Sequence, residues 1–193
     1  MSRQAEGDAG EKAGDSHLIE TKVSSEAVFD GTLLHVRRDI VRLPDGSLAT
    51  REHIVHPGAV LIVPVLPDGR LVVERQFRYP LGRVFIEFPA GKIDLGESPL
   101  DTARRELREE AGFDATHWTP LGTIHTLISY TNERIDLFVA EGLSQLGAKL
   151  DAGEFLDVVM MTEDAMLAAL DRGEITDAKT VAALLLFARR RRA

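Results

Sequence analysis

Residues 91–113, GKIDLGESPLDTARRELREEAGF, decide the fold of this chain. Ser98 and Pro99 are typical of a helix start, because a serine side chain can cap the first backbone N–H groups and proline suits the first helical position. Gly112 suits the left-handed residue that ends a helix. Between these signals an apolar stripe recurs at helical spacing, at Leu100, Ala103, Leu107 and Ala111. The stretch therefore predicts an amphipathic helix over residues 99–111.

Three carboxylates lie close together on that helix. Glu106 and Glu110 are one turn apart, so their side chains point the same way, and Glu109 flanks them. Like charges so close together repel one another unless a cation neutralises them. RRELREE alone would also fit a solvated helix of mixed charge, but that alternative leaves the approach EFPAGKIDLGE (87–97) and its Glu97 unexplained.

The spacing of this stretch is identified as the Nudix signature. It runs glycine, five residues, Glu, seven residues, Arg-Glu-apolar, one residue, Glu-Glu, one residue and Gly-apolar, and every position is met from Gly91 to Phe113. At average residue usage, a chance match is well below about one in ten million per window. The chain thus resembles the Nudix hydrolases, which cleave a nucleoside diphosphate linked to another group. The resemblance implies an α/β fold, an α/β/α sandwich with a mixed sheet.

Composition narrows the class of protein further. The chain has 193 residues, enough for one ordinary domain and a small appendage. Its net charge of -8 argues against a nucleic-acid or anionic-membrane partner. There is no cysteine, the apolar runs are too short to span a bilayer, and no signal peptide is read. We therefore expect a cytoplasmic protein that binds neither nucleic acid nor membrane.

Three parts are expected along the chain. Residues 1–16 are polar and are predicted to be a disordered tail. Residues 17–56 contain three β-like stretches separated by turn signals, and they predict a small antiparallel β subdomain. Because so small a sheet cannot bury itself well, it must pack on the main domain or on another copy of the chain. Residues 57–193 are predicted to form the Nudix hydrolase domain.

The main domain is predicted to mix strands and helices, which indicates a mixed sheet between helical layers. Strands are expected at 59–66, 71–77, 85–88, 118–127, 135–140 and 155–161. Helices are expected at 163–170, capped by Thr162, and at 178–189, capped by Asp177.

Carboxylate oxygens gathered on one helix face suit Mg²⁺ or Mn²⁺ better than zinc. The resemblance implies two or three such ions, which bridge the pyrophosphate and the acidic residues. It implies that Glu106, Glu110 and the backbone carbonyl of Ala90 bind metal, and that Glu109 is a ligand or a partner of metal-bound water. Glu97 and Arg105 are expected to be more structural, because an arginine can fix a carboxylate by bidentate pairing.

The general base is harder to place from the sequence. In many pyrophosphatases of this family that act on nucleoside sugars, the loop before the last strand supplies a Glu. Here that loop reads KLDAGEFLDVV, residues 149–159. Glu154 matches the metal-binding or base position best, and Asp151 and Asp157 are weaker candidates. The alternative is that Glu154 is only a solvated loop residue.

Further segments resemble the ADP-ribose pyrophosphatase branch. They are the N-terminal β block, HPGAV (56–60), ERQFRYP (74–80), EFPAGKID (87–94) and DAKT (177–180). The resemblance implies a homodimer whose N-terminal sheets are exchanged or packed across the two-fold axis. It also implies that ADP-ribose is cleaved to AMP and ribose 5-phosphate.

Three substrate-binding residues follow from that branch. The resemblance places Arg78 on a phosphate, Arg51 on the substrate and Glu133 on the terminal ribose or near the metals. A surface salt bridge is the alternative for Arg78. Ser129 stands where many ADP-ribose enzymes carry proline. The choice among ADP-ribose, GDP-mannose, other nucleotide sugars and diadenosine polyphosphates therefore stays open, as does a nucleotide-binding regulator without turnover.

Overall fold

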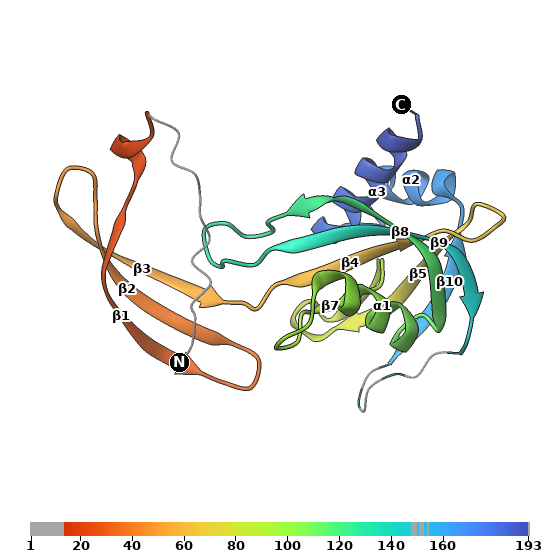
Figure 1. The fold of residues 1–193 in the computed structure, drawn as a ribbon, viewed down its shortest axis with the longest axis horizontal. Coiled ribbons are helices and arrows are strands. Elements are labelled where there is room, and N and C mark those ends of the chain that lie inside the picture. Colours follow the sequence, from red (N-terminus) through yellow and green to blue (C-terminus); the bar gives the residue numbers. More distant parts are fainter. Residues whose placement is uncertain (1–13, 148–149, 151–152, 154, 193) are drawn as a thin grey trace. The chain divides into compact units, whose positions relative to one another are not determined.

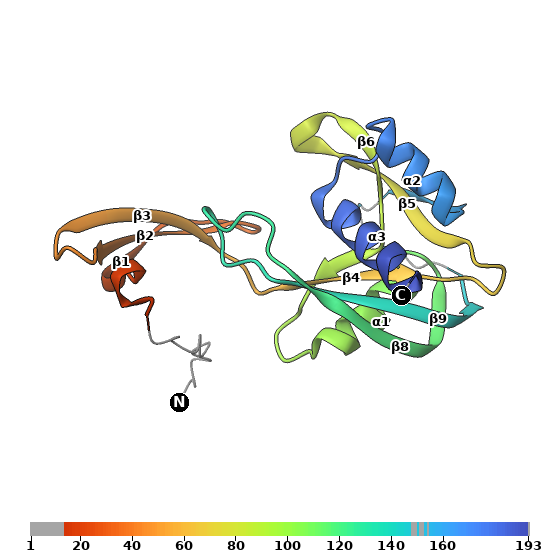
Figure 2. The same cartoon turned by 90° about the horizontal axis from the view of Figure 1, so that it is seen from above.

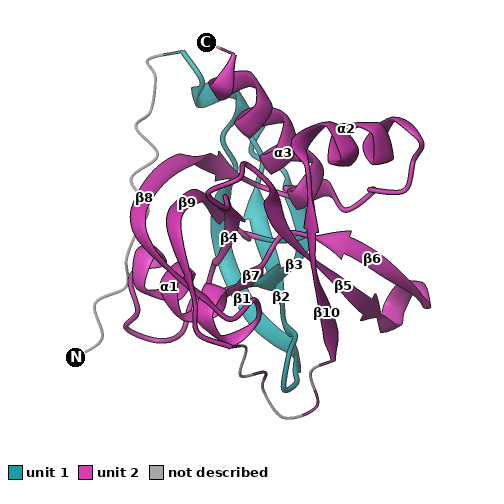
Figure 3. Cartoon of the chain, turned by 90° about the vertical axis from the view of Figure 1, so that its right-hand side faces the viewer, with its two compact units in different colours: residues 1–55, 129–131 teal, residues 56–128, 132–193 magenta. Residues whose placement is uncertain are grey.

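The computed structural model describes residues 14–147, 150, 153 and 155–192. The candidate bases Glu154 and Asp151 lie outside the described residues. The chain divides into two compact units, Met1–Val55 with Ser129–Thr131 and His56–Ile128 with Asn132–Ala193 (Figure 3).

The first unit is a three-stranded antiparallel sheet. After a short 3₁₀ helix, η1 (Ser16–Leu18), its strands are β1 (Thr21–Asp30), β2 (His35–Arg42) and β3 (Leu48–Val55), in the order β1-β2-β3. Every residue of β1 is exposed, and of the residues described in this unit only Asp39 and Val41 are buried. The sheet has hardly any core of its own, as its apolar-poor sequence predicts.

The second unit contains two sheets (Figures 1 and 2). The mixed sheet has the order β7 (Ala90–Lys92), β4 (Ala59–Pro64), β9 (Ile135–Gln145) and β8 (Phe113–Ile124). Only its β4–β9 pairing is parallel. The other sheet is antiparallel, with the order β10 (Leu156–Met161), β5 (Leu71–Arg78) and β6 (Arg83–Glu87), and η2 (Tyr79–Leu81) joins β5 to β6.

Helices cover both faces of the mixed sheet. Strand β4 is wholly buried because its successive side chains point to opposite faces. Leu61 and Val63 join a core with α2 (Glu163–Asp171) and α3 (Ala178–Arg191), and Val60 and Ile62 join a core with α1 (Pro99–Glu109). This arrangement confirms the predicted α/β/α sandwich with a mixed sheet and a separate antiparallel N-terminal sheet. None of the helices in the described ranges has the length and apolar character that crossing a bilayer requires.

Helix starts follow local signals closely. The side chains of Ser98, Thr162 and Asp177 each accept a backbone N–H three residues on, as their N-cap positions predict. The signature helix ends at Glu109, two residues earlier than predicted, and Gly112 then adopts a left-handed φ of 74°. Strand β8 begins at Phe113 rather than at residue 118, because pairing with β9 already starts there.

Candidate active site

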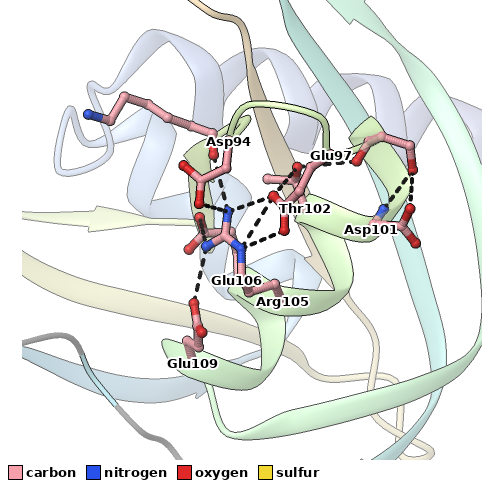
Figure 4. Close-up of polar contacts among 9 residues, drawn as sticks. Asp94, Glu97, Asp101, Thr102, Arg105, Glu106 and Glu109 are labelled. Carbon is pink, nitrogen blue, oxygen red and sulfur yellow. Dashed lines mark hydrogen bonds and ion pairs between the residues drawn. The ribbon is translucent and has the colours of Figure 1, made fainter.

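Arg105, on α1, is the centre of a network of ion pairs (Figure 4). Its Nε and Nη2 each donate to an oxygen of Glu97, both at 3.0 Å. Its Nη1 donates to Glu106 Oε1 at 2.7 Å and to Glu109 Oε2 at 3.1 Å. Nη2 also donates to the backbone oxygen of Lys92 at 3.2 Å, so the guanidinium ties the helix to β7. One cation thus offsets the repulsion among three carboxylates of the signature.

Glu97 is held in its ionised form. Hydrogen bonds from Arg105, and then from the Thr102 hydroxyl at 2.8 Å, lower the pKa of Glu97 to about 2. The same contacts raise the pKa of Arg105, chiefly through Glu97. The structure therefore joins Arg105 to Glu97 through a bidentate ion pair, and the structural role of this pair stays a prediction.

We predict that Glu97 makes stability depend on acid pH. Its pKa is lower in the folded chain than its usual value of 4.5, so the ionised form stabilises the fold. That contribution is fully present above about pH 4.5 and is lost as the pH falls toward about 2. Between about pH 4.5 and about pH 2, the unfolding temperature of Glu97→Gln should therefore change less with pH than that of the wild type. Parallel slopes for the two proteins would contradict the pairing.

Glu106 and Glu110 are buried against β7, with 9% and 6% of their surface exposed. Glu110 Oε2 accepts the backbone N–H of Ala90 at 3.0 Å. A Cβ on Gly91 would lie 1.8 Å from Glu106 Oε1, so the Glu106 side chain occupies the space that any larger residue needs. Glycine at position 91 therefore permits a close approach that a side chain would prevent. Its close neighbour is the carboxylate of Glu106.

The donor atoms collected here fit a hard divalent cation in their chemistry. The carboxylates of Glu106 and Glu110 both lie against the backbone at Ala90 and Gly91, and carboxylate oxygens suit Mg²⁺ or Mn²⁺. Over residues 14–147, 150, 153 and 155–192, no three Asp, Glu or His side chains already have metal-binding spacing. An ion at this place would therefore need further oxygen ligands, from the backbone, the substrate or water.

Arg78 lies in a second charge cluster of the same unit. Its Nε and Nη2 donate to the two oxygens of Glu87, both at 2.8 Å, and Glu87 is 3% exposed. Lys179 donates to the same carboxylate and to Asp177, the latter at 2.9 Å. Burial would raise the pKa of Glu87, but Arg78 and Lys179 outweigh burial and lower it. The Arg78 salt bridge is real, but its carboxylate is buried and not on the surface.

A cavity of about 400 Å³ opens beside this cluster. It is lined by Arg78, Pro80, Leu81, Phe85, Glu87, Thr176, Asp177, Ala178 and Lys179. The pKa of Arg78 is raised first by its hydrogen bond to Glu87 and also by the charge of Glu110, so Arg78 is within electrostatic reach of the signature. The cavity has both charged and apolar lining residues, and Arg78, whose side chain is 42% exposed, could bind a phosphate-bearing ligand there.

The other two substrate candidates lie in different units. Arg51, in the first unit, donates from Nε to Glu20 at 2.9 Å. Glu133, in the second, accepts from the Thr126 hydroxyl and lies 3.6 Å from Nε2 of His56. The sequence assigned no role to His56, although HPGAV was the signal that could have singled it out. Glu154 is outside the described residues, so the structure leaves its assignment as a prediction.

The sequence and the fold of this chain are similar to those of known proteins. Residues 55–184 match the family model described as NUDIX domain, and residues 20–54 match the nucleoside diphosphate sugar hydrolase N-terminal domain. The ADP-ribose pyrophosphatase of Bacillus subtilis (strain 168) is 38% identical over 86% of this chain and 91% of that protein. The methanol dehydrogenase activator of Bacillus methanolicus is 38% identical over 86% of this chain and 92% of that protein.

A solved structure agrees with the sequence comparisons. The crystal structure of an ADP compounds hydrolase matches with a TM-score of 0.79 and 29% identity, over 88% of this chain and 92% of that one. The chain belongs to the Nudix hydrolase family, whose members generally depend on divalent metal ions. The predicted resemblance to this family and to its ADP-ribose pyrophosphatase branch is confirmed.

Proposed function

We propose that this protein hydrolyses the pyrophosphate bond of a nucleoside diphosphate sugar in the cytoplasm, with ADP-ribose, cleaved to AMP and ribose 5-phosphate, as its first substrate. The observation that carries the proposal is the gathering of the buried Glu106 and Glu110 carboxylates at the backbone of Ala90 and Gly91. The relative from Bacillus subtilis, named ADP-ribose pyrophosphatase, supports the choice of substrate.

The residues divide the work as follows. Glu106 and Glu110 would hold metal with the carbonyl of Ala90, while Arg105 keeps Glu106 and Glu109 in place. Two or three Mg²⁺ ions, or Mn²⁺ in their place, would neutralise phosphate charge and lower the pKa of the attacking water. A water oxygen bonds to one phosphorus, the anhydride P–O bond breaks, and the bridging oxygen leaves with the other phosphate. We assign the proton of that water to Glu154, which also serves as a metal ligand in this proposal.

Arg78, Arg51 and Glu133 are proposed to bind the substrate. Arg78 donates two of its five guanidinium N–H groups to Glu87, so the others can still donate to a phosphate oxygen. Arg51 would contact the substrate, and Glu133 would contact the terminal ribose or lie near the metals. We propose that Glu133 does so across a homodimer.

We predict a homodimer built on the first unit. Large apolar side chains are exposed there, among them Val23, Val28, Phe29, Leu33, Leu34, Leu48 and Val55, and exposed apolar patches mark interaction sites. Sedimentation equilibrium should give twice the chain mass of 21.2 kDa. Phe29→Asp should shift the mass toward that of one chain, whereas Leu146→Asp, equally exposed in the second unit, should not. A monomeric wild type would contradict the dimer.

The activity is tested by incubating the protein with ADP-ribose and Mg²⁺ and resolving the nucleotide products by ion exchange. AMP should appear, and excess EDTA should abolish its release. The panel should include GDP-mannose, other nucleotide sugars and diadenosine polyphosphates. Cleavage of one of these but not ADP-ribose would change the substrate, and no cleavage of any would overturn the proposal.

The methanol dehydrogenase activator among the relatives favours a second candidate, a regulator that binds nucleotide without turnover. The intact carboxylates of Glu106, Glu109 and Glu110 count against it, because mere binding does not need repelling charges held together. Calorimetric binding of ADP-ribose in the presence of Mg²⁺, with no AMP released over hours, would favour this second candidate.

A further inference from the structure

The motif DAKT (177–180) ties the start of α3 to the segment that leads into the signature. Asp177 caps the helix by accepting the Thr180 N–H at 3.0 Å. The Thr180 hydroxyl accepts the backbone N–H of Phe88 at 3.2 Å, and Thr180 is fully buried. Lys179 donates to Glu87, the residue before Phe88. Two neighbouring residues of one helix turn therefore hold two neighbouring residues of the chain that enters β7.

Lys179 and Arg78 share one buried carboxylate. Glu87 Oε2 accepts from both Lys179 Nζ and Arg78 Nη2, while Oε1 accepts from Arg78 Nε. The Glu87 side chain is 4% exposed and that of Lys179 is 17% exposed, whereas that of Arg78 is 42% exposed. Glu87 thus binds two cations, and Arg78 is the more exposed of the two.

We propose that Lys179 is a positioning residue for Arg78. By holding Glu87 Oε2 from the α3 side, Lys179 fixes the carboxylate on which the Arg78 guanidinium rests, so that the remaining N–H groups of Arg78 face a substrate phosphate. Lys179 donates to Glu87 and Asp177, and in this proposal it does not contact the substrate itself. This inference rests on the proposed function, in which Arg78 binds phosphate.

The balance of charge in the cluster explains why a lysine is needed at position 179. Asp177 and Glu87 carry two negative charges and Arg78 and Lys179 carry two positive ones, so the cluster is balanced. A carboxylate as buried as Glu87 must keep its partners, because losing one leaves charge uncompensated in a region of low dielectric constant. Without Lys179, Arg78 is the one cation left on Glu87 among the described ion pairs, and we expect its guanidinium to turn further toward that carboxylate.

The test is a double-mutant cycle on ADP-ribose hydrolysis. Lys179→Met keeps the length of the side chain and removes its charge. It should raise KM about tenfold, the scale of one weakened charge-assisted contact, and leave kcat within about threefold. In an Arg78→Met background the same change should alter KM by less than about twofold, because the residue through which it acts is gone. Lys179→Arg should retain most of the affinity.

Arg70→Met is the matched control. Arg70 lies in the same unit and also donates to a carboxylate, that of Asp68 at 2.8 Å. Neither Arg70 nor Asp68 lines the cavity, so the removal of Arg70 should leave KM unchanged and show no coupling to Arg78.

A loss of folding is separated from a loss of positioning by one more variant. Glu87→Gln/Lys179→Met removes both charges, so the unfolding temperature should recover while KM stays raised. Recovery of KM together with stability would mean that Lys179 acts only on the fold and would overturn the inference. An equal effect of Lys179→Met with and without Arg78 would also overturn it. Absence of AMP release by the wild type would instead contradict the proposed function, and the cycle would then be read on AMP affinity by calorimetry.

Discussion

Replacing Glu110 with glutamine should lower kcat for ADP-ribose hydrolysis at least about a hundredfold, the scale of losing a charge-stabilising group. Glutamine has nearly the same shape, and its side-chain oxygen can still accept the Ala90 N–H, which donates to Glu110 at 3.0 Å. The variant therefore loses the negative charge but not the contact that joins the helix to β7. Rates of AMP release at saturating ADP-ribose and Mg²⁺ measure the effect.

The fold should tolerate this substitution. Removing one of several neighbouring negative charges relieves repulsion, so the free energy of unfolding should change by less than about 1 kcal/mol, or about 2–4 °C in melting temperature. Asp101→Asn is a control from the first turn of the same helix, since it removes a carboxylate outside the site. It should leave kcat unchanged. A Glu110→Gln enzyme within about threefold of the wild-type rate would contradict the metal-binding role, because that role supplies the hundredfold.

The parts of the fold that local chemistry specifies were predictable from the sequence. Each helix start rests on a side chain that caps a backbone N–H three residues away, so Ser98, Thr162 and Asp177 identify their helices without tertiary information. Strand β7 was not predicted, because three residues of AGK have no period of their own. They form a strand only where Ala90 and Lys92 meet partners on β4.

The candidate site divides in the same way. Helical spacing alone places the Glu106 and Glu110 side chains on one side of the helix, beside its apolar stripe. It does not predict how deeply these two carboxylates are buried. Both residues are in fact buried, because β7 passes over them. The ion pair of Glu87 with Lys179 joins residues that are 92 positions apart. The sequence shows that both residues are charged, but it does not show that they pair with each other.

Two arginines hold the carboxylates in opposite ways. Arg105 donates to Glu97, Glu106 and Glu109 through its three nitrogens, so its guanidinium is fully used within the signature. Arg78 donates from one edge of its guanidinium to a single buried carboxylate, and its other edge can donate to a ligand in the cavity. The difference follows from the number of acids that each arginine meets, and it supports a structural role for Arg105 and a binding role for Arg78.

Gly91→Ala should be the most damaging substitution of an uncharged residue in the site. The added Cβ would lie 1.8 Å from Glu106 Oε1 and 2.0 Å from its Cδ, distances at which the side chain must move. Because the atoms in the way belong to a side chain, the fold can adjust at a cost of about 1–3 kcal/mol. The carboxylate of Glu106, however, would leave its place beside Glu110. We therefore expect kcat to fall about a hundredfold while the protein stays folded.

A second cycle shows whether Glu106 causes that loss. In a Glu106→Ala background the obstructing atoms are absent, so adding Gly91→Ala should cost almost no further stability, measured by urea denaturation. In the wild-type background the same change should lower the urea midpoint clearly. Equal costs in the two backgrounds would show that alanine strains the backbone of β7 itself, and the close approach of Glu106 would then not be the reason for glycine. A coupling between the two sites would instead identify Gly91 as the residue that makes room for the Glu106 carboxylate.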